Sequence, residues 1–188
     1  DKVAEVKEMV GVMFQGAAGD QLTNVELGIL DEVLRELYRS RGFTSDPASL
    51  YSPLSSAHGR EKKPMPTLSD LLSALKARLP ATERLVHALL PYVAGGSMGI
   101  FDGESQVDLS GAVAVCFDIS QLENRFLKPL AMHVALNWTW DKFAKKNRRK
   151  KRIVVDEAWK LLYYPDAAVF LERAARTGRK WNVSLTCV

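Results

Sequence analysis

The sequence predicts an α/β protein in which a helical first half precedes a parallel sheet covered by helices. Apolar residues recur at helical spacing through most of residues 1–95. Residues 96–188 instead hold three short apolar runs, separated by stretches of helical periodicity. Strands that are apolar throughout and alternate with helices are typical of a parallel sheet covered on both sides. We therefore expect a helical subdomain in residues 1–95 and an α/β part in residues 96–188.

Four helices are expected in the first half. Apolar residues at helical spacing from residue 3 to residue 13 predict the first. The second and third begin with a threonine and an acid at capping-box spacing, Thr23 with Glu26 and Thr67 with Asp70. The segment TERLVHALLPYV predicts the fourth. Residues 43–66 are rich in proline, serine and charge, and we expect them to form a long surface loop.

Three strands and two helices are expected in the second half. The strands are the apolar runs at residues 112–117, 153–155 and 183–188. The helix between the first two has Pro129 in its first turn and extends through AMHVALNWTWDKFAKK. The helix between the last two has Asp166 as its expected N-cap and Gly178 at its end.

Composition indicates a chain that folds without disulfide bonds. Its 188 residues are 47% hydrophobic, which is enough for one domain or one and a half. Cys116 and Cys187 each lie inside an apolar run, and we expect buried thiols and a reducing, cytosolic compartment. No apolar stretch approaches the roughly 20 residues that cross a bilayer.

The net charge of +4 is concentrated in one segment. Residues 1–100 carry 11 basic and 12 acidic side chains, whereas residues 101–188 carry 15 and 10. The run AKKNRRKKR holds seven positive charges, including Lys145, Lys146, Arg148, Arg149, Lys150 and Lys151. This basic loop either binds the phosphates of a nucleic acid, contacts anionic lipid, or is a solvated connection before a buried strand. The sequence favours the solvated connection.

The most specific chemical signal is the acid pair Asp156 and Glu157, which follows the apolar run at residues 153–155. In a parallel sheet, ligands collect at the carboxyl ends of the strands. An apolar strand followed by Asp-Glu is the Walker B pattern of P-loop NTPases, in which one acid holds magnesium and the other activates water. The alternative is a solvated start of the next helix, where acids are favourable.

The phosphate-binding partner of such a pair, GxxxxGK[ST], does not occur in the sequence. Gly11 and Gly16 have the required separation, but Ala17 follows in place of lysine. Either the acids do not serve a nucleotide, or the chain is a piece of a longer protein whose P-loop lies upstream.

Several segments together resemble the VirB-four family of type IV secretion and conjugation ATPases, which includes TraC and TrbE. FDGESQVDLSGAVAVCFDISQLENRFLKPLAM is similar to one family pattern, and RIVVDEAWKLL is similar to the family's Walker B strand. PDAAVFLERAARTGRKWNVSLTCV resembles the segment that precedes a Thr-Gln motif, and LTNVELGILDEVLREL and PTLSDLLSAL resemble its helical region. The resemblance covers nearly the whole chain, with the motifs in order.

This resemblance implies part of a RecA-like P-loop NTPase domain that uses ATP and Mg²⁺. Asp156 is then the magnesium ligand and cofactor-binding acid, and Glu157 is the catalytic base. Family members form oligomers, with hexamers expected, and drive pilus assembly and substrate transfer from the cytoplasmic side of the inner membrane. The P-loop lysine and the motif glutamine have no position in this chain, so the chain alone is expected to be inactive.

Two further candidates follow from their distance to the acid pair. Among Arg173, Arg176, Arg179 and Lys180, the first candidates for an arginine finger toward a neighbouring subunit are Arg176 and Arg179. The alternative, which the sequence favours, is a helix end decorated with cations. Asp118 follows a predicted strand and precedes an apparent SQLE capping box. It is either a second cofactor-binding acid near the magnesium or an ordinary turn acid.

Two rival functions stay open on the sequence. Another RecA-like DNA translocase or helicase predicts salt-sensitive DNA binding and DNA-stimulated hydrolysis. A non-catalytic module would dock another secretion component through its helical first half.

Overall fold

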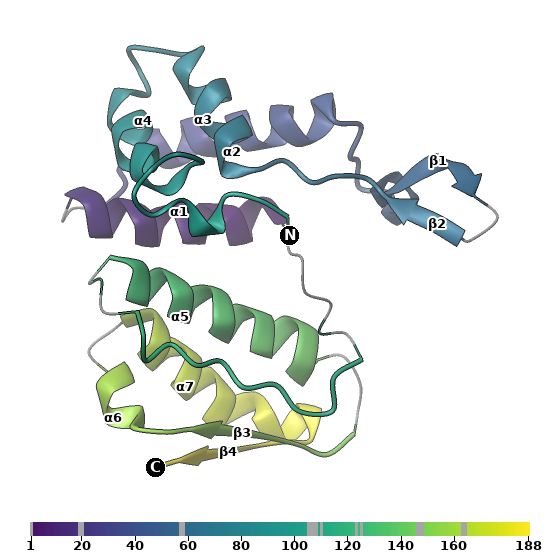
Figure 1. Cartoon of the computed structure of the whole chain (residues 1–188), viewed down its shortest axis with the longest axis vertical. Coiled ribbons are helices and arrows are strands. Elements are labelled where there is room, and N and C mark those ends of the chain that lie inside the picture. The colour runs from purple at the N-terminus through teal and green to yellow at the C-terminus, as the bar shows by residue number, and fades with distance from the viewer. Residues whose placement is uncertain are drawn as a thin grey trace. The chain divides into compact units, whose positions relative to one another are not determined.

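The computed structural model describes residues 2–18, 21–56, 59–104, 109, 111–122, 124, 126–145, 149–162 and 165–188. The chain forms two compact units, residues 1–106 and residues 107–188 (Figure 1). The division falls after residue 106 rather than after residue 95, where the sequence placed it.

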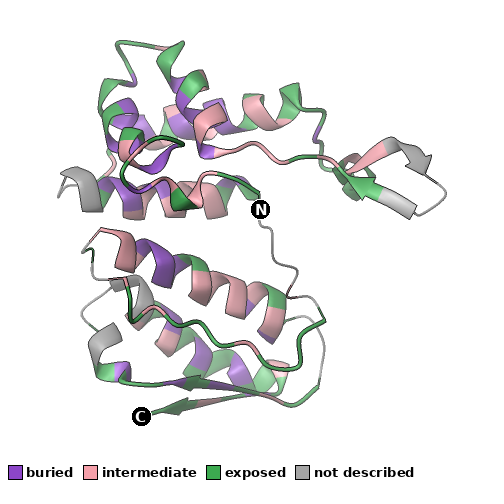
Figure 2. Ribbon diagram, in the orientation of Figure 1, coloured by how far each residue is buried: buried purple, intermediate pink, exposed green. Residues whose placement is uncertain are grey.

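The first unit is built from four helices, as the sequence predicts: α1 (Lys2–Ala18), α2 (Asn24–Ser40), α3 (Leu68–Lys76) and α4 (Glu83–Leu89). Both expected capping boxes are present, at the starts of α2 and α3. The helices bury a shared apolar core (Figure 2). Its most enclosed side chains are Val10, Met13, Phe14, Leu30, Val33, Leu34, Leu71, Leu75, Leu85, Leu89 and Tyr92.

The segment between α2 and α3 is more ordered than the expected surface loop. It contains a 3₁₀ turn (Pro47–Leu50) and an antiparallel hairpin of β1 (Tyr51–Ser56) and β2 (Gly59–Lys62). The Asp46 side chain caps the turn by accepting a hydrogen bond from the Ala48 amide at 2.8 Å. Pro and Gly are depleted in strands, which is why the sequence did not indicate the hairpin.

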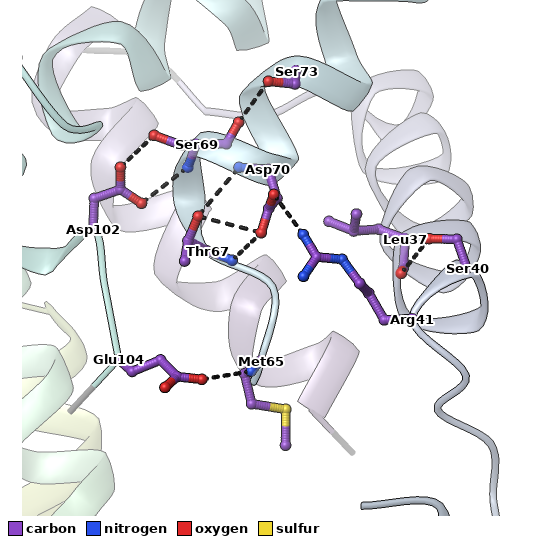
Figure 3. A network of polar contacts seen from close by, with 10 residues as sticks. All are labelled: Leu37, Ser40, Arg41, Met65, Thr67, Ser69, Asp70, Ser73, Asp102 and Glu104. Carbon is purple, nitrogen blue, oxygen red and sulfur yellow. Dashed lines mark hydrogen bonds and ion pairs between the residues drawn. The ribbon is translucent and has the colours of Figure 1, made fainter. Parts of the chain in front are cut away.

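A polar network fixes the segment after α4 to the N-terminus of α3 (Figure 3). The Asp102 carboxylate accepts hydrogen bonds from the Ser69 amide at 3.0 Å, from the Ser69 hydroxyl and from the Ala94 amide at 2.6 Å. Glu104 accepts one from the Met65 amide at 2.8 Å. These contacts explain why residues 96–106 belong to the helical unit.

The second unit contains α5 (Leu127–Trp138), a π-helical continuation (Thr139–Ala144), β3 (Lys151–Val155), α6 (Ala158–Leu161), α7 (Pro165–Thr177), a 3₁₀ turn (Gly178–Trp181) and β4 (Val183–Cys187). The two strands pair in parallel, from Lys151 opposite Val183 to Val155 opposite Cys187. The expected β-α-β order at the end of the chain is therefore confirmed. The helix α7 begins at Pro165, and the side chain of its expected cap, Asp166, lies outside the described residues.

The core of this unit lies against one face of the two strands. Ile153, Val155 and Val183 are buried with Trp140 and Phe170, whose rings meet edge to face at 6.2 Å. On the opposite face the side chain of Val154 is 60% exposed. Within the described residues, the expectation of a sheet covered on both sides is therefore wrong.

The apolar run at residues 112–117 is not a strand, contrary to expectation. Val113 is 96% exposed, and Phe117 contacts Trp138 edge to face at 5.6 Å. An isolated extended segment gains little without a ladder partner, because its backbone groups stay with water. The expectation of buried thiols is also wrong, since Cys116 and Cys187 are both exposed. Within the described residues, no helix is both long and apolar enough to cross a bilayer.

Candidate functional site

Asp156 and Glu157 form the turn between β3 and α6, at the carboxyl end of a parallel pair of strands. Both side chains are exposed. Asp156 Oδ1 accepts a hydrogen bond from the Glu157 amide at 2.9 Å. The sequence-predicted acids thus stand at the edge where ligands of parallel α/β sheets collect.

Glu157 has a left-handed backbone conformation, with φ 49° and ψ 43°. This region costs a residue with a Cβ atom about 1 kcal/mol or more, and such conformations cluster at functional sites. The left-handed conformation could not be predicted from the sequence, because neither glycine nor asparagine stands in DEAW. In the described residues the only other such non-glycine residue is Asn182 (φ 55°), a type that tolerates this region.

The end of β4 is bonded directly to the acid turn. The Val188 amide donates to the Val155 carbonyl at 3.0 Å, and the Val188 carbonyl accepts from the Ala158 amide at 3.1 Å. Residue 188 therefore occupies the position next to Asp156 and Glu157, and it satisfies an otherwise open donor at the start of α6.

The donor set suits a hard divalent cation. Carboxylate oxygens are the ligands that Mg²⁺ takes from proteins, usually one or two together with water and phosphate oxygens. No hydrogen bond or ion pair among the described residues engages Asp156 Oδ2. The exposed carboxylate of Asp156 therefore fits an ion that keeps most of its own water.

The basic residues that the sequence proposed as arginine-finger candidates do not lie around Asp156 and Glu157. Arg176 lies on α7 and pairs with Glu172 at 3.0 Å. Arg179 and Lys180 lie in the 3₁₀ turn before β4, which is the amino end of the sheet. The five residues of β3 span about 16 Å, so the chain does not bring Arg179 to its own acid pair. An arginine finger toward a neighbouring subunit stays a prediction.

Asp118 has the geometry of a turn acid. Its carboxylate accepts a hydrogen bond from the Ser120 amide at 2.9 Å, and the bonds to Ser120 lower the pKa of Asp118. The apparent SQLE capping box does not start a helix, because α5 begins only at Leu127; Glu123 lies outside the described residues. A cofactor-binding role for Asp118 stays a prediction.

The basic loop is anchored at both of its described ends. Lys145 pairs with Asp141 at 2.6 Å. The Lys151 amino group donates to the Ala144 carbonyl at 2.5 Å and the Trp181 carbonyl at 3.5 Å. Arg149 and Lys150 are exposed, whereas Lys146 and Arg148 lie outside the described residues.

No known family pattern matches this chain, and no curated protein matches it. Among solved structures, it is similar to VirB4 of Thermoanaerobacter pseudethanolicus, with 24% sequence identity and a TM-score of 0.70. The likeness covers 98% of this chain and 49% of that protein, so the chain spans about half of its length. The chain therefore has the fold of a VirB4 segment, which agrees with the resemblance that its motifs carry.

Proposed function

We propose that this chain is the part of a type IV secretion ATPase that carries the magnesium acid and the catalytic base. The observation that carries the proposal is the acid pair at the carboxyl end of β3, inside a fold shared with VirB4. The RecA-like assignment of residues 107–188 belongs to this proposal, as does the helical unit as a subdomain of the motor.

Each acid has a distinct role in this proposal. Asp156 holds the magnesium of a bound magnesium–ATP complex, largely through water, and the ion neutralises charge on the phosphates. Glu157 orients the attacking water and accepts its proton. Neighbouring residues at a strand end point in different directions, so one acid can face the ion while the other faces the water.

The wider role follows from the same family. The motor assembles as an oligomer, for which we propose a hexamer, and works on the cytoplasmic side of the inner membrane with other secretion components. It powers pilus assembly and substrate transfer. Arg176 is the candidate to reach a neighbouring subunit's nucleotide, because its side chain on α7 is exposed to solvent and does not pack in the core.

The test compares Glu157→Gln and Asp156→Asn in the full-length protein. Glu157→Gln removes the proton acceptor and keeps the side-chain shape, so hydrolysis should fall by ~10² or more while ATP still binds. Asp156→Asn should also weaken the magnesium-dependent part of ATP binding. Glu8→Gln is the matched control, since Glu8 is an exposed acid of the other unit, and it should change neither quantity.

Steady-state hydrolysis and ATP affinity are measured for each variant, with the melting temperature as a folding control. Parental hydrolysis by Glu157→Gln would show that the acid turn is only a helix start. Loss of both binding and hydrolysis by a folded Glu157→Gln would show that Glu157 holds the nucleotide, and the two roles would have to be exchanged.

A further inference from the structure

The segment before α5 exposes an apolar run whose backbone groups are open. Residues 112–117, AVAVCF, form an extended trace (Figure 1), and the side chains of Val113 and Phe117 are 96% and 42% exposed. Within the described part of the chain, no hydrogen bond engages the amides or carbonyls of residues 113–117. An apolar segment with open backbone groups is a template for strand pairing. We call residues 112–117 the strap.

The strand β3 offers an edge to which such a segment can pair. Among the described residues the sheet consists of β3 and β4 alone, so the ladder of β3 lies on one side. On its other side, no described residue bonds the backbone of residues 152–155. The strap and this edge therefore both hold unpaired donors and acceptors, which a parallel ladder would satisfy together.

The order of the elements selects this edge rather than the outer edge of β4. A strand, a helix and a second strand of one parallel sheet are joined by a right-handed crossover in about 98% of cases. The strap, α5 and β3 have this order, and so do β3, α7 and β4. Trp140, in the π-helical continuation of α5, and Phe170 of α7 pack in one core on one face of the strands.

Two crossovers of the same hand over the same face step in the same direction across the sheet. The strap therefore belongs on the side of β3 that faces away from β4. Figure 1 also shows the strap running in the same direction as β3, as a parallel strand requires.

We propose that the strap docks on the free edge of β3 as a third parallel strand, in a second conformation of this unit. Alternate side chains of a strand face the same side of the sheet. The larger side chains of the strap are those of Val113, Val115 and Phe117. They face the core when Phe117 stands level with Val155, which is buried there. Phe117 already contacts Trp138 of α5, the helix of the same crossover, at 5.6 Å.

Docking brings the end of the strap to the acid turn. In this register Asp118 follows the strap as Asp156 follows β3, one strand spacing of about 4.8 Å away. The acid turn is then flanked by Asp118 on one side and, on the other, by Val188, whose backbone already bonds it. That Asp118 thereby stands beside a magnesium acid rests on the proposed function, whereas the docking itself rests on the topology.

Disulfide trapping measures which strand the strap meets. Cys187→Ser leaves Cys116 as the single thiol of the chain. In the docked register Cys116 stands level with Val154, about 4.8 Å away, which a disulfide can bridge, so Val154→Cys in this background is the test variant. Thr186→Cys is the matched control. Thr186 pairs with Val154 and is also exposed, but it lies one strand further, about 9.6 Å from Cys116, beyond the reach of a disulfide.

The 188-residue variants are oxidised at low protein concentration with diamide, which takes up the two hydrogens of the thiols. Disulfide formation is followed by mass spectrometry, and circular dichroism confirms that each variant is folded. Val154→Cys should close an intramolecular disulfide at least ~10-fold faster than Thr186→Cys.

Hydrogen exchange of the unmodified chain tests the same docking without any substitution. Docking bonds the strap to β3, so the amides of residues 113–117 should exchange ~3-fold or more slowly relative to an unstructured peptide of the same sequence.

Three outcomes would overturn the proposal. Closure by Thr186→Cys as fast as by Val154→Cys would mean that the strap does not choose the edge of β3. A disulfide-linked dimer in place of the intramolecular bond would assign the strap to the sheet of a second copy. Exchange of residues 113–117 at the rate of the unstructured peptide would show that the strap stays undocked. None of these results depends on ATP hydrolysis, so failure of this proposal and failure of the proposed ATPase are distinguishable.

Discussion

Replacing Glu157 by asparagine should make the second unit more stable while removing the proposed catalytic base. Glu157 is held at φ 49° and ψ 43°, where a glutamate side chain is unfavourable. Asparagine tolerates this conformation because its short side chain bonds locally to the backbone. The strain at the acid turn is thus a property of residue 157 that mutation can relieve.

The expected size follows from the backbone alone. Left-handed conformation costs a residue such as glutamate about 1 kcal/mol or more, and asparagine avoids part of this cost. Glu157→Asn should therefore raise the free energy of unfolding by about 0.5 to 1 kcal/mol. Glu157→Gly should gain less, since glycine loses more conformational entropy on folding. Glu157→Gln and Glu157→Ala keep the strain and remove the charge, so they isolate side-chain effects.

Urea unfolding followed by tryptophan fluorescence is a suitable assay. All four tryptophans, at positions 138, 140, 159 and 181, lie in the second unit, so the signal reports on that unit. Asn182→Ala provides a control of opposite sign: Asn182 has φ 55°, and alanine there should lower the free energy of unfolding by about 1 kcal/mol.

The reasoning about strain would be refuted if Glu157→Asn were no more stable than Glu157→Gln and Glu157→Ala. It would also be refuted if Asn182→Ala had no effect, because the left-handed conformation would then carry no measurable cost in this unit.

Three further predictions concern the first unit and can be checked by circular dichroism melting. Thr67→Ala removes the hydroxyl that accepts from the Asp70 amide at 3.3 Å and should cost about 1 kcal/mol; equal stability would contradict the capping role. Burial opposes ionisation of Asp102, but hydrogen bonds from Ser69 and Ala94 outweigh it and lower its pKa. The carboxylate therefore stabilises the fold above the unfolded pKa of about 3.9, and this contribution is lost as pH falls through the folded pKa. Asp102→Asn should remove that part of the acid dependence, and an unchanged pH profile would argue against it. A Cβ atom at Gly96 would lie 2.4 Å from the Pro91 carbonyl oxygen, so Gly96→Ala should cost about 2 kcal/mol. Gly103→Ala, in the same unit, meets nothing within 4 Å and should be close to neutral.

Local signals in the sequence predicted the helices well. The capping boxes at Thr23 and Thr67 depend on residues three positions apart, so the sequence contains all the participants. The parallel pair β3 and β4 was also predictable, because two apolar runs flank one helix. The acid pair was found for the same reason, since it directly follows a strand.

Features that depend on distant partners were not predictable in this way. Asp102 bonds Ser69, which lies 33 positions earlier, and nothing near Asp102 in the sequence indicates that partner. The run at residues 112–117 has the composition of a strand, but strand formation also requires a neighbour with open backbone groups. Glu157 adopts its backbone conformation against its own residue preference, because the strand before it and α6 after it fix the direction of the chain.

The backbone hydrogen bonds of Val188 couple the position of the acid turn to the position of β4. The Val188 amide donates to the Val155 carbonyl at 3.0 Å, and the Ala158 amide donates to the Val188 carbonyl at 3.1 Å. One of these bonds lies on each side of the acids along the chain. A slide of β4 by one residue, about 3.3 Å along its axis, would break both bonds together. Any event that displaces β4 must therefore move or release Asp156 and Glu157, so the geometry of the acid pair reports on the position of the neighbouring strand.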